Sequence, residues 1–487
     1  MHDLETALGP PKTAPAAPQR SGPPWAIVAT VLPAAAALLT RMRAIDLAYH
    51  VRAGELILAS GHVGRTDQFT FTSAGDPWLN QQWAADAMFA LAHRLLGWGG
   101  VAILYAIATG VGFAFVYAHC RGRRASPLVA AVFTLGGFIV STGPAPRPQA
   151  LAVPLFTGTA LLLTRRDRWR WLVVPMAVLW ANVHGSFVLA PLLVAFVVAD
   201  DVLEHRPWRS IGLFAATIVG TFVTPFGPSV WTYALDIARN DTIRRWVVEW
   251  RPPTLTSVSG FAFWASGAVV LLIAIRRHRR VRPVDAARLI VFFALAAPAI
   301  RGTLWWALIL PPIVAGWFAS EAVEAPVRRR LDPVAVVAAA CIIALLPLAF
   351  ALRSGIDPVT GAPRRLAADA PQVLVEAVRS SVPAGSRLLV YQPFASWFEF
   401  ALPEDPVMVD SRIELYPDAV WVDYDRAVGG AEPWQRILDR YGVRAVVLPP
   451  DSEPQGLSKR IAGADGWEAV SDGPAGSVFV RIPSPPG

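Results

Sequence analysis

Charged and amide side chains in this sequence lie at the borders of long apolar runs. Side chains of this kind are costly inside a bilayer, so each of them requires a partner or a function. Arginine suits phosphate oxygens especially well, because its planar guanidinium can donate two parallel hydrogen bonds. A mixture of acids, arginines, histidines and amides gathered at one membrane face predicts a site for a charged ligand. The candidates are Asp46, His50, Arg52, Arg65, Asp67, Arg147, Gln149, Asn182, His184, Glu249 and Arg301.

The apolar runs predict a polytopic membrane protein. Hydrophobic residues make up 54% of the 487 residues, charged residues only 16%, and the mean hydropathy is +0.42. A soluble protein of this size could not hide so much apolar surface from water. Runs of about 17–25 apolar residues, the length that a helix needs to cross the hydrocarbon layer, recur along the chain. About eleven spans are predicted, near 25–41, 99–119, 127–143, 148–164, 171–183, 186–203, 210–225, 260–275, 285–300, 303–320 and 333–352.

Basic clusters give these spans an orientation. They follow every second span, near residues 121–124, 165–170, 206–209, 276–282 and 328–330. By the positive-inside rule the N-terminus is then cytoplasmic and the C-terminus extracytoplasmic, with Arg41 and Arg43 as exceptions. Residues 1–24 are predicted to be a disordered cytoplasmic tail. Because the basic residues are scattered over several loops, they do not form a nucleic-acid site.

Three regions are predicted outside the membrane. Residues 42–97 form an amphipathic loop in which 46–60 and 81–96 are expected as interfacial helices, joined through a turn at Gly75-Asp76-Pro77. Residues 226–259 form a second loop. From residue 353 to residue 487, short β-branched runs alternate with helical segments, which predicts a small α/β domain. Its strands are expected at Leu388–Tyr391, Val407–Asp410, Ala445–Leu448 and Ser477–Ile482, and its helices include 371–381 and 433–441.

Several motifs in these regions resemble those of bacterial membrane glycosyltransferases of the GT-C type. In the first loop they are Asp46-Leu-Ala-Tyr-His50, Gly54-Glu-Leu-Ile-Leu-Ala-Ser-Gly61, Arg65-Thr-Asp67-Gln-Phe-Thr-Phe and Pro77-Trp78…Gln82-Trp83. Further along they are Trp180-Ala-Asn182-Val-His184-Gly185, Thr224-Pro225-Phe226-Gly227 and Val409-Asp410-Ser411-Arg412. The resemblance implies a GT-C-like domain at 25–352 in the bacterial inner membrane. It also implies a polyprenyl-phosphate-linked sugar as donor and a glycan or lipid of the cell envelope as acceptor.

The resemblance also implies roles for individual residues. It makes Asp46 the base or a metal-linked residue, and a divalent metal such as Mg²⁺ or Mn²⁺ stays open as a cofactor. Many relatives carry a second acid directly after this one, whereas this chain has Leu47. We therefore add His50 and Asp67 to Asp46 as candidate catalytic residues. The predicted substrate-binding residues are Arg52, Arg65, Gln82, Arg147, Asn182, His184, Glu249 and Arg301.

The implied reaction has two requirements that the protein must meet. A sugar linked to a lipid phosphate already carries its leaving group, so the reaction needs positive charge on the departing phosphate and a base for the acceptor hydroxyl. Electrostatic stabilisation is often the largest catalytic contribution, and a general base typically contributes ~10²–10⁴-fold. Arg147 and Arg301 are the candidates for the phosphate, and Asp46 is the candidate base.

Structural roles for the same residues remain alternatives. Asp46 could cap a helix at 47–60. Arg147 and Arg301 could extend from span ends to lipid phosphates. The polar residues at 182–184 could satisfy backbone groups in a short span.

The alternative function is a non-catalytic transporter of lipid-linked glycans, or an envelope-assembly scaffold with a degenerate GT-C fold. A transporter should place ionisable residues near the middle of the bilayer, often with paired repeats. This sequence instead places them at one face. Nor does it show a zinc-type cluster, a phosphate-binding glycine loop or a Gly-x-Ser-x-Gly elbow, which favours a lipid-linked donor over a nucleotide sugar.

Overall fold

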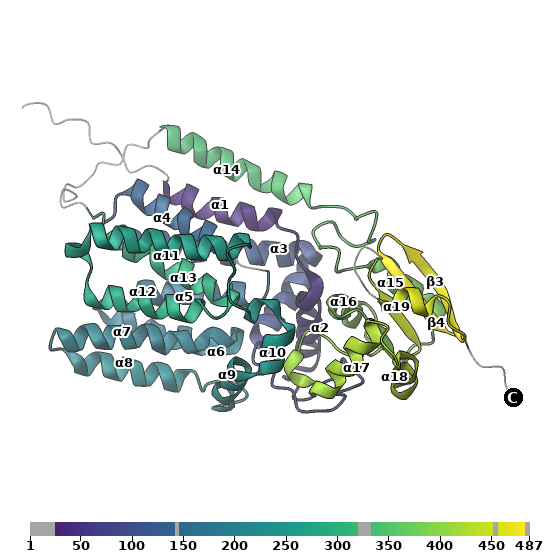
Figure 1. The fold of residues 1–487 in the computed structure, drawn as a ribbon. Coiled ribbons are helices and arrows are strands. Elements are labelled where there is room, and N and C mark those ends of the chain that lie inside the picture. Colours follow the sequence, from purple (N-terminus) through teal and green to yellow (C-terminus); the bar gives the residue numbers. More distant parts are fainter. Residues whose placement is uncertain (1–24, 142–145, 320–332, 451–455, 483–487) are drawn as a thin grey trace, which may run out of the picture.

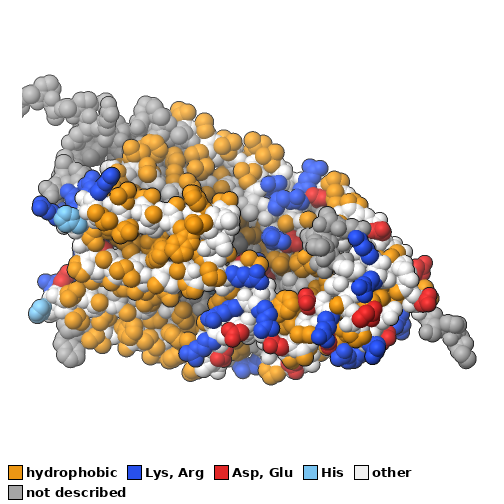
Figure 2. Space-filling view, in the orientation of Figure 1, with side chains coloured by type: hydrophobic (Ala, Val, Ile, Leu, Met, Phe, Trp, Pro, Cys, Tyr) orange, Lys and Arg blue, Asp and Glu red, His pale blue; other side chains and the backbone are white. Residues whose placement is uncertain are grey.

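The computed structural model describes residues 25–141, 146–319, 333–450 and 456–482. A bundle of helices occupies one end of the molecule, and a small sheet with its own helices occupies the other (Figure 1). Hydrophobic side chains cover most of the bundle in the view of Figure 2, whereas acidic and basic side chains gather around the sheet-containing end. The predicted tail at 1–24 and the basic cluster at 328–330 lie outside the described residues.

The bundle consists of helices that correspond to the predicted spans. Three segments are long and apolar enough to cross a membrane by length and composition: α3, α11 and the stretch Gly185–Leu203, which contains α7. Several others are shorter apolar helices, so the count of about eleven spans stays a prediction. The bundle helices are α1 (Trp25–Leu39), α3 (Trp83–Gly122), α4 (Pro127–Val140), α5 (Pro148–Leu162), α6 (Val173–Val183), α7 (Leu189–Leu203), α8 (Pro207–Gly220), α11 (Val258–Arg276), α12 (Pro283–Ala296), α13 (Thr303–Gly316) and α14 (Pro333–Leu352).

Helix α3 joins two elements that the sequence predicts separately. The expected interfacial helix at 81–96 and the expected span at 99–119 form the two helical segments of α3, on either side of a kink at Leu96 and Gly97 where the backbone is not helical. Gly97 has φ 56°, a left-handed conformation that glycine adopts without a steric penalty. Gly97 therefore lets the chain change direction between the two helical segments.

The first loop begins with α2 (Ala44–Ser60), which lies against the first half of α3. Gly54 makes this close approach possible, since a Cβ there would lie 2.0 Å from the carbonyl oxygen of Asp86. The predicted turn follows, with Gly75 at φ 83° and the Gly75 amide donating to the Asp67 carbonyl at 3.0 Å. The second loop forms α9 (Ser229–Arg239), α10 (Asp241–Trp246) and the short 3-10 helix η3 (Val248–Trp250).

The C-terminal region forms a four-stranded sheet in the order β1-β2-β4-β3. Strands β1 (Leu388–Val390) and β2 (Ala445–Leu448) are parallel, while β4 (Gly476–Arg481) is antiparallel to both β2 and β3 (Trp467–Gly473). The helices of this region are α15 (Gln372–Ser381), α16 (Gln392–Ala401), α17 (Asp418–Val428), α18 (Trp434–Tyr441) and α19 (Gly456–Ile461), with the 3-10 helix η6 (Ile413–Leu415).

Two details of this sheet differ from the sequence prediction. The expected strand at Val407–Asp410 forms only isolated bridges, in which Val407 pairs with Leu388 of β1 and with Thr70 of the first loop. This extended segment therefore joins the sheet to the loop. Strand β3 is missing from the prediction because its residues are mostly exposed and lack a β-branched run.

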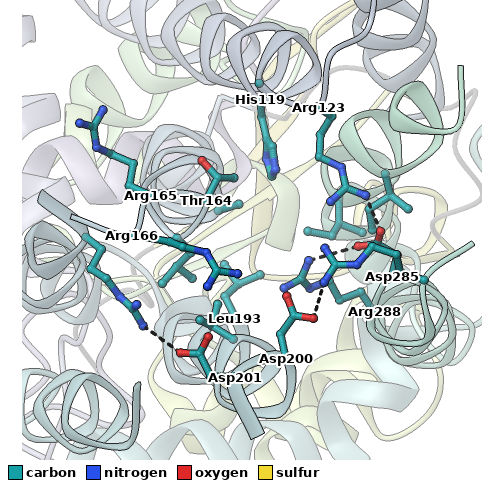
Figure 3. Close-up of a pocket in the computed structure, with 18 residues that line it drawn as sticks. His119, Arg123, Thr164, Arg165, Arg166, Leu193, Asp200, Asp201, Asp285 and Arg288 are labelled. Carbon is teal, nitrogen blue, oxygen red and sulfur yellow. Dashed lines mark hydrogen bonds and ion pairs between the residues drawn. The ribbon is translucent and has the colours of Figure 1, made fainter. Parts of the chain in front are cut away.

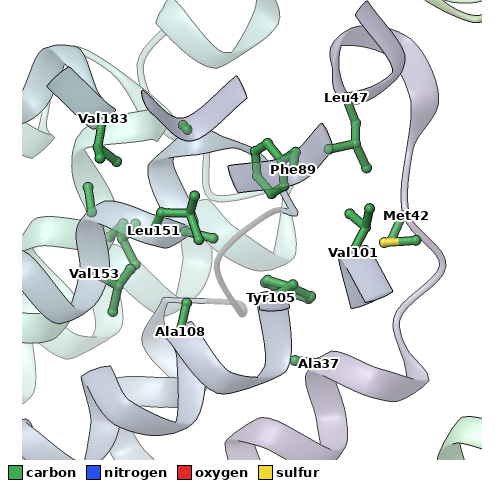
Figure 4. Packing of buried hydrophobic residues seen from close by; sticks show 14 of the residues in the cluster. Ala37, Met42, Leu47, Phe89, Val101, Tyr105, Ala108, Leu151, Val153 and Val183 are labelled. Atoms are coloured by element: carbon green, nitrogen blue, oxygen red, sulfur yellow. The ribbon is translucent and has the colours of Figure 1, made fainter. Parts of the chain in front are cut away.

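The membrane-side bundle and the C-terminal region share one hydrophobic core. The same cluster contains Leu47 and Phe89 from the first loop and α3, and Leu388 and Trp397 from the C-terminal region. Figure 4 shows how α2 and α3 contribute to it. The backbone amide of Tyr49 in α2 also donates to the Ser396 hydroxyl of α16 at 2.7 Å. The C-terminal region is therefore packed onto the first loop rather than tethered beside it.

Reporter fusions test the predicted orientation. We expect a fusion after Gly361 to report an extracytoplasmic position and a fusion after Gly122 a cytoplasmic one, because the basic clusters alternate with the spans. Paired phosphatase and green-fluorescent-protein fusions at both sites measure this. A cytoplasmic signal at Gly361 would contradict the predicted topology.

Candidate active site

A cavity of about 470 Å³, here called the first cavity, lies between α2, the second loop and the segment 411–414. It also receives residues from the beginnings of α5 and α13 and from the connection between α6 and α7. The predicted site residues that line it are Asp46, His50, Gln82, Arg147, Gln149, His184, Glu249 and Arg301. The structure thus brings together residues that are separated by more than 250 positions in the chain.

Asp46 does not cap a helix. Helix α2 begins at Ala44 with Arg43 at its N-cap, and Asp46 lies in the first turn with its Oδ2 3.0 Å from Nε of Arg147. The other carboxylate oxygen, Oδ1, is buried and has no hydrogen-bond partner among the described residues. A buried acceptor left open in this way is costly unless a ligand or a proton completes it.

Arg147 links two acids across the cavity. Its Nη1 lies 2.5 Å from Oε1 of Glu249, while its Nε contacts Asp46. It precedes Pro148 at the start of α5, where the proline ring fixes the first turn of the helix. With two carboxylates already bound to it, Arg147 has less charge to offer to a phosphate than the sequence suggests.

Arg301 is the freer cation. It lies in the short 3-10 helix η5 (Ile300–Gly302), and its guanidinium lies over the Trp250 ring at 4.6 Å from the ring centroid. Among the described residues it forms no ion pair, and its backbone carbonyl accepts from Gln149 Nε2 at 3.3 Å. A cation held by an aromatic face rather than by an acid keeps its hydrogen-bond donors for a ligand.

His50 is held by a buried acid that sequence reasoning missed. Its Nδ1 lies 2.7 Å from Oδ1 of Asp86 in α3, and Asn80 Nδ2 donates to the other Asp86 oxygen at 2.8 Å. Since the carboxylate accepts, Nδ1 carries the proton and Nε2 remains for the cavity. An imidazole oriented by an acid in this way is typical of a general base. Asp86 lies 36 residues beyond His50, a separation from which no sequence spacing rule predicts a contact.

His184 presents a hydrogen-bond donor instead. The Ser186 amide donates to His184 Nδ1 at 3.1 Å, and the Ser186 hydroxyl lies 2.7 Å from the same nitrogen. Trp180 Nε1 donates to that hydroxyl at 3.0 Å, so the hydroxyl proton points to His184. Nδ1 is therefore the acceptor, and the proton of the neutral ring lies on Nε2.

The C-terminal region supplies a wall of the first cavity. Glu414 of η6 accepts a hydrogen bond from the Tyr233 hydroxyl of α9 at 2.8 Å, and both residues line the cavity. Burial raises the pKa of the Glu414 carboxyl above its ordinary value. Burial, followed by the neighbouring Glu414, also raises the pKa of Tyr233 and keeps its hydroxyl protonated. Sequence reasoning missed both residues, because nothing in their local pattern distinguishes them from surface residues.

Asp67 lies behind this wall and does not line the first cavity. It is 2% exposed, and its Oδ1 lies 2.6 Å from Nη2 of Arg412. Its Oδ2 accepts from the Thr70 hydroxyl at 2.5 Å. The structure therefore places Asp67 in a buried ion pair instead of at the reaction centre.

Arg412 is the centre of that buried cluster. Its Nε donates to Asp410 Oδ2 at 2.7 Å, and its guanidinium lies 4.6 Å from the Trp78 ring centroid and 4.9 Å from that of Phe69. Nearby, burial and then the charge of Asp410 raise the pKa of the Glu399 carboxyl well above its ordinary value. Asp410 and Arg412 of the Val409-Asp410-Ser411-Arg412 motif therefore form an ion pair.

Three other predicted substrate-binding residues are also absent from the lining of the first cavity. Arg52 lies 3.6 Å from Glu55 one turn along α2. Arg65 donates to the Pro225 carbonyl at 2.8 Å, which ties the first loop to the second. Asn182 accepts from Trp83 Nε1 at 2.7 Å and donates to two backbone carbonyls. These contacts position the loops around the cavity.

The acids of the first cavity do not form a metal site. Mg²⁺ and Mn²⁺ prefer several oxygen ligands at once. Both Asp46 and Glu249 bind Arg147, and within the described part of the chain no three His, Cys, Asp or Glu residues lie close enough to share an ion. We therefore derive no catalytic step through a metal.

Leu47 explains why a second acid is absent next to Asp46. Its side chain is fully buried in the hydrophobic core and does not line the first cavity. Figure 4 shows it facing Val101 and Met42. Glu249 provides a second carboxylate near Asp46 from a different part of the chain.

The fold is that of known membrane glycosyltransferases. No protein-family model matches the chain, and no curated protein matches it by sequence. Among solved structures, ArnT from Cupriavidus metallidurans bound to undecaprenyl phosphate is similar with a TM-score of 0.54 and 14% identity, over 94% of this chain and 98% of ArnT. Its apo form gives a TM-score of 0.53 with 14% identity, over 94% and 97% of the two chains.

An archaeal enzyme has the same architecture. The oligosaccharyltransferase of Archaeoglobus fulgidus, tethered to an acceptor peptide, is similar with a TM-score of 0.54 and 13% identity, over 87% of this chain and 69% of that one. These structures are GT-C glycosyltransferases. The chain therefore has the GT-C fold, as its motifs predict.

The Arg412 cluster allows a stability test. We expect Arg412→Gln to lower the free energy of unfolding by about 3–5 kcal/mol, because it leaves buried carboxylates without their cation. Arg440→Gln is the control, since Arg440 is 60% exposed in its pair with Asp423 and such a surface pair contributes about 0–1 kcal/mol. Denaturant titration of the purified protein in detergent measures both. Equal stability of the two variants would contradict a structural role for Arg412.

Proposed function

We propose that this chain is a glycosyltransferase that moves a sugar from a polyprenyl-phosphate-linked donor to an extracytoplasmic acceptor of the bacterial cell envelope. The observation that carries this proposal is that the first cavity contains one carboxylate oxygen and one guanidinium that are both available to a ligand. Asp46 has a carboxylate oxygen without a hydrogen-bond partner, and Arg301 has a guanidinium without an ion-pair partner, both among the described residues. The first suits an acceptor hydroxyl and the second a phosphate.

The GT-C fold supports this reading of the site. One structural neighbour was solved with undecaprenyl phosphate and another with an acceptor peptide, so the fold accommodates a lipid phosphate and an acceptor. The predicted position of the first cavity, at the external end of the spans, would give it access to a lipid donor from the outer leaflet. Its lining also includes the apolar residues Val188, Leu235 and Val247 beside the charged groups, as an amphipathic ligand requires.

The reaction would proceed by displacement at the anomeric carbon. The acceptor oxygen forms a bond to this carbon while the bond from the carbon to the phosphate oxygen breaks. Asp46 Oδ1 takes the proton of the acceptor hydroxyl, and the electron pair leaves with the polyprenyl phosphate. Arg301 stabilises the charge that develops on the departing phosphate, which is worth most where water is excluded.

Other residues of the first cavity would orient the reactants. Arg147 pairs with Asp46 and fixes its Oδ2. His184 can donate from Nε2 to a phosphate or sugar oxygen, and Glu414 with Tyr233 can bind sugar hydroxyls at the C-terminal wall. His50, oriented by Asp86, is the alternative base if Asp46 serves only to position Arg147.

A deletion strain tests the function as a whole. Loss of the enzyme should leave its donor unused, so lipid extracts should accumulate one polyprenyl-phosphate-linked sugar while one envelope glycan loses that sugar. Mass spectrometry of lipids and envelope glycans measures both. An unchanged lipid pool, with an intact glycan mislocalised to the inner face, would instead support a transporter.

Substitutions of Asp46 distinguish a catalytic role of this residue from a structural one. We expect Asp46→Asn to reduce sugar transfer by about 10²-fold or more, because it removes the base while keeping the size of the side chain. Asp46→Glu should retain part of the activity, since it keeps the charge but moves the carboxylate. The measurement is transfer in membranes that contain matched amounts of each variant.

Glu55→Gln is the matched control for Asp46→Asn. It makes the same change of charge in the same helix, but Glu55 pairs with Arg52 and does not line the first cavity. Full activity of both Asp46→Asn and His50→Gln would rule out acid–base catalysis from α2.

Arg301 tests the phosphate contact. We expect Arg301→Gln to weaken the binding of undecaprenyl phosphate by about tenfold or more, because a charge-assisted hydrogen bond is lost. Arg301→Lys should retain part of the affinity, since it keeps the charge without the planar fork. Arg244→Gln is the control, because Arg244 is 56% exposed on α10 and lies outside the cavity lining. Competition of undecaprenyl phosphate with a labelled donor measures the affinities, and equal values for Arg301→Gln and Arg244→Gln would contradict the assignment.

A further inference from the structure

A second cavity, of about 260 Å³, lies at the opposite ends of the helices that reach the first cavity. Helix α5 begins beside the first cavity at Pro148 and ends beside the second near Leu163. Helix α12 begins beside the second cavity with Asp285 and Arg288, and the chain after it reaches the first cavity at Arg301. A helix of fifteen residues is ~22 Å long, so the two cavities are distinct sites. On the predicted topology the second cavity faces the cytoplasm.

Arginines dominate the lining of the second cavity. They come from the end of α3, from the segment after α5, and from the start of α12 and the residues before it, and Figure 3 shows several of them around the open centre. Three aspartates accompany six arginines: Arg123, Arg165, Arg166, Arg170, Arg282 and Arg288 with Asp200, Asp201 and Asp285. Two further acids just outside the lining, Asp167 and Glu204, pair with Arg165 and Arg166. The remaining surplus of positive charge is at Arg123 and Arg288, which share Asp285 as their acid.

This surplus of positive charge lies in the buried part of the second cavity. Asp285 is fully buried and forms ion pairs with two arginines, with Arg123 in a short contact and with Arg288 at 3.3 Å. The side chain of Arg288 is only 19% exposed, and that of Arg123 22% exposed. One carboxylate cannot neutralise two guanidiniums, and a charge withdrawn from water without compensation is unfavourable.

A purely structural ion-pair network does not explain the open space. Protein interiors are close-packed, so salt bridges that served only to join helices would leave few voids between them. Here the arginines surround a space larger than a phosphate group. One wall of this space is apolar, formed by Leu193, Val197, Ile309 and Ile313.

We propose that the second cavity binds a phosphate group of an anionic ligand from the predicted cytoplasmic side. Guanidiniums match phosphate oxygens in geometry and charge. The Thr164 hydroxyl and the His119 ring, which also line the cavity, add further polar contacts. The shared chemistry is a phosphate ester, which an anionic phospholipid headgroup or a soluble phosphate compound can supply. The apolar wall favours the lipid. This site is independent of sugar transfer in the first cavity.

Thermal unfolding of the full chain in detergent tests the proposal. The probes are inorganic phosphate, short-chain phosphatidylglycerol and, at matched ionic strength, sodium chloride. We expect phosphatidylglycerol to raise the unfolding midpoint in a saturable way, because a ligand that binds only the folded state stabilises it. Stabilisation by inorganic phosphate to the same extent would identify a soluble phosphate ester as the source, whereas stabilisation by phosphatidylglycerol alone would identify a lipid headgroup.

Substitutions of single arginines test whether the stabilising ligand binds in the second cavity. Arg288→Gln should weaken phosphate or phosphatidylglycerol binding by about tenfold or more. Arg166→Gln serves if Arg288→Gln does not fold, because Arg166 is 59% exposed and its pair with Glu204 is on the surface. Arg279→Gln is the matched control, since it removes the same charge from an exposed position outside the cavity. The proposal is overturned if neither probe stabilises the protein beyond sodium chloride, or if binding by Arg279→Gln falls as much as binding by the cavity variants.

Discussion

The Arg412 guanidinium holds the first loop and the C-terminal region of this chain together. It bonds Asp410 from its own region and Asp67 from the first loop, and it lies against Trp78 and Phe69 of the same loop. The residues next to it in sequence, Ser411 and Glu414 among them, form one wall of the first cavity. That wall can stay in place only while the loop and the sheet keep their relative position. The geometry of the cavity therefore depends on the ion pair between Arg412 and the two aspartates.

Helix α2 divides its residues between the cavity and the core. Asp46, Tyr49 and His50 lie three and four positions apart and so share the face that lines the first cavity. Leu47 and Val51 lie on the other side and are fully buried in the core. The same periodicity places Leu47, the residue directly after Asp46, in the core and away from the cavity.

Sequence reasoning identifies the elements of this fold more completely than their contacts. Hydrophobic runs predict the helices because burial in lipid or core requires them, and the positions of Arg147, His184 and Arg301 at helix ends predict their convergence. Contacts such as that of His50 with Asp86 depend on how α2 lies against α3, which no local pattern encodes. Asp67 was misplaced for the same reason, because its partner Arg412 lies more than 340 residues away. Glu414 and Tyr233 gain their importance only when the C-terminal region closes over the second loop.

The contact at Gly54 has a consequence for mutational scanning of this protein. Gly54 carries no functional group, yet a Cβ there would collide with the backbone of α3 at Asp86. Any larger residue would push α2 away from α3 at Asp86. His50, one turn before Gly54 in α2, would then lose its contact with the Asp86 carboxylate. A scan would then rank an inert glycine beside the residues that line the cavity. In this fold, sensitivity to substitution measures how closely two helices approach as much as which side chains take part in chemistry.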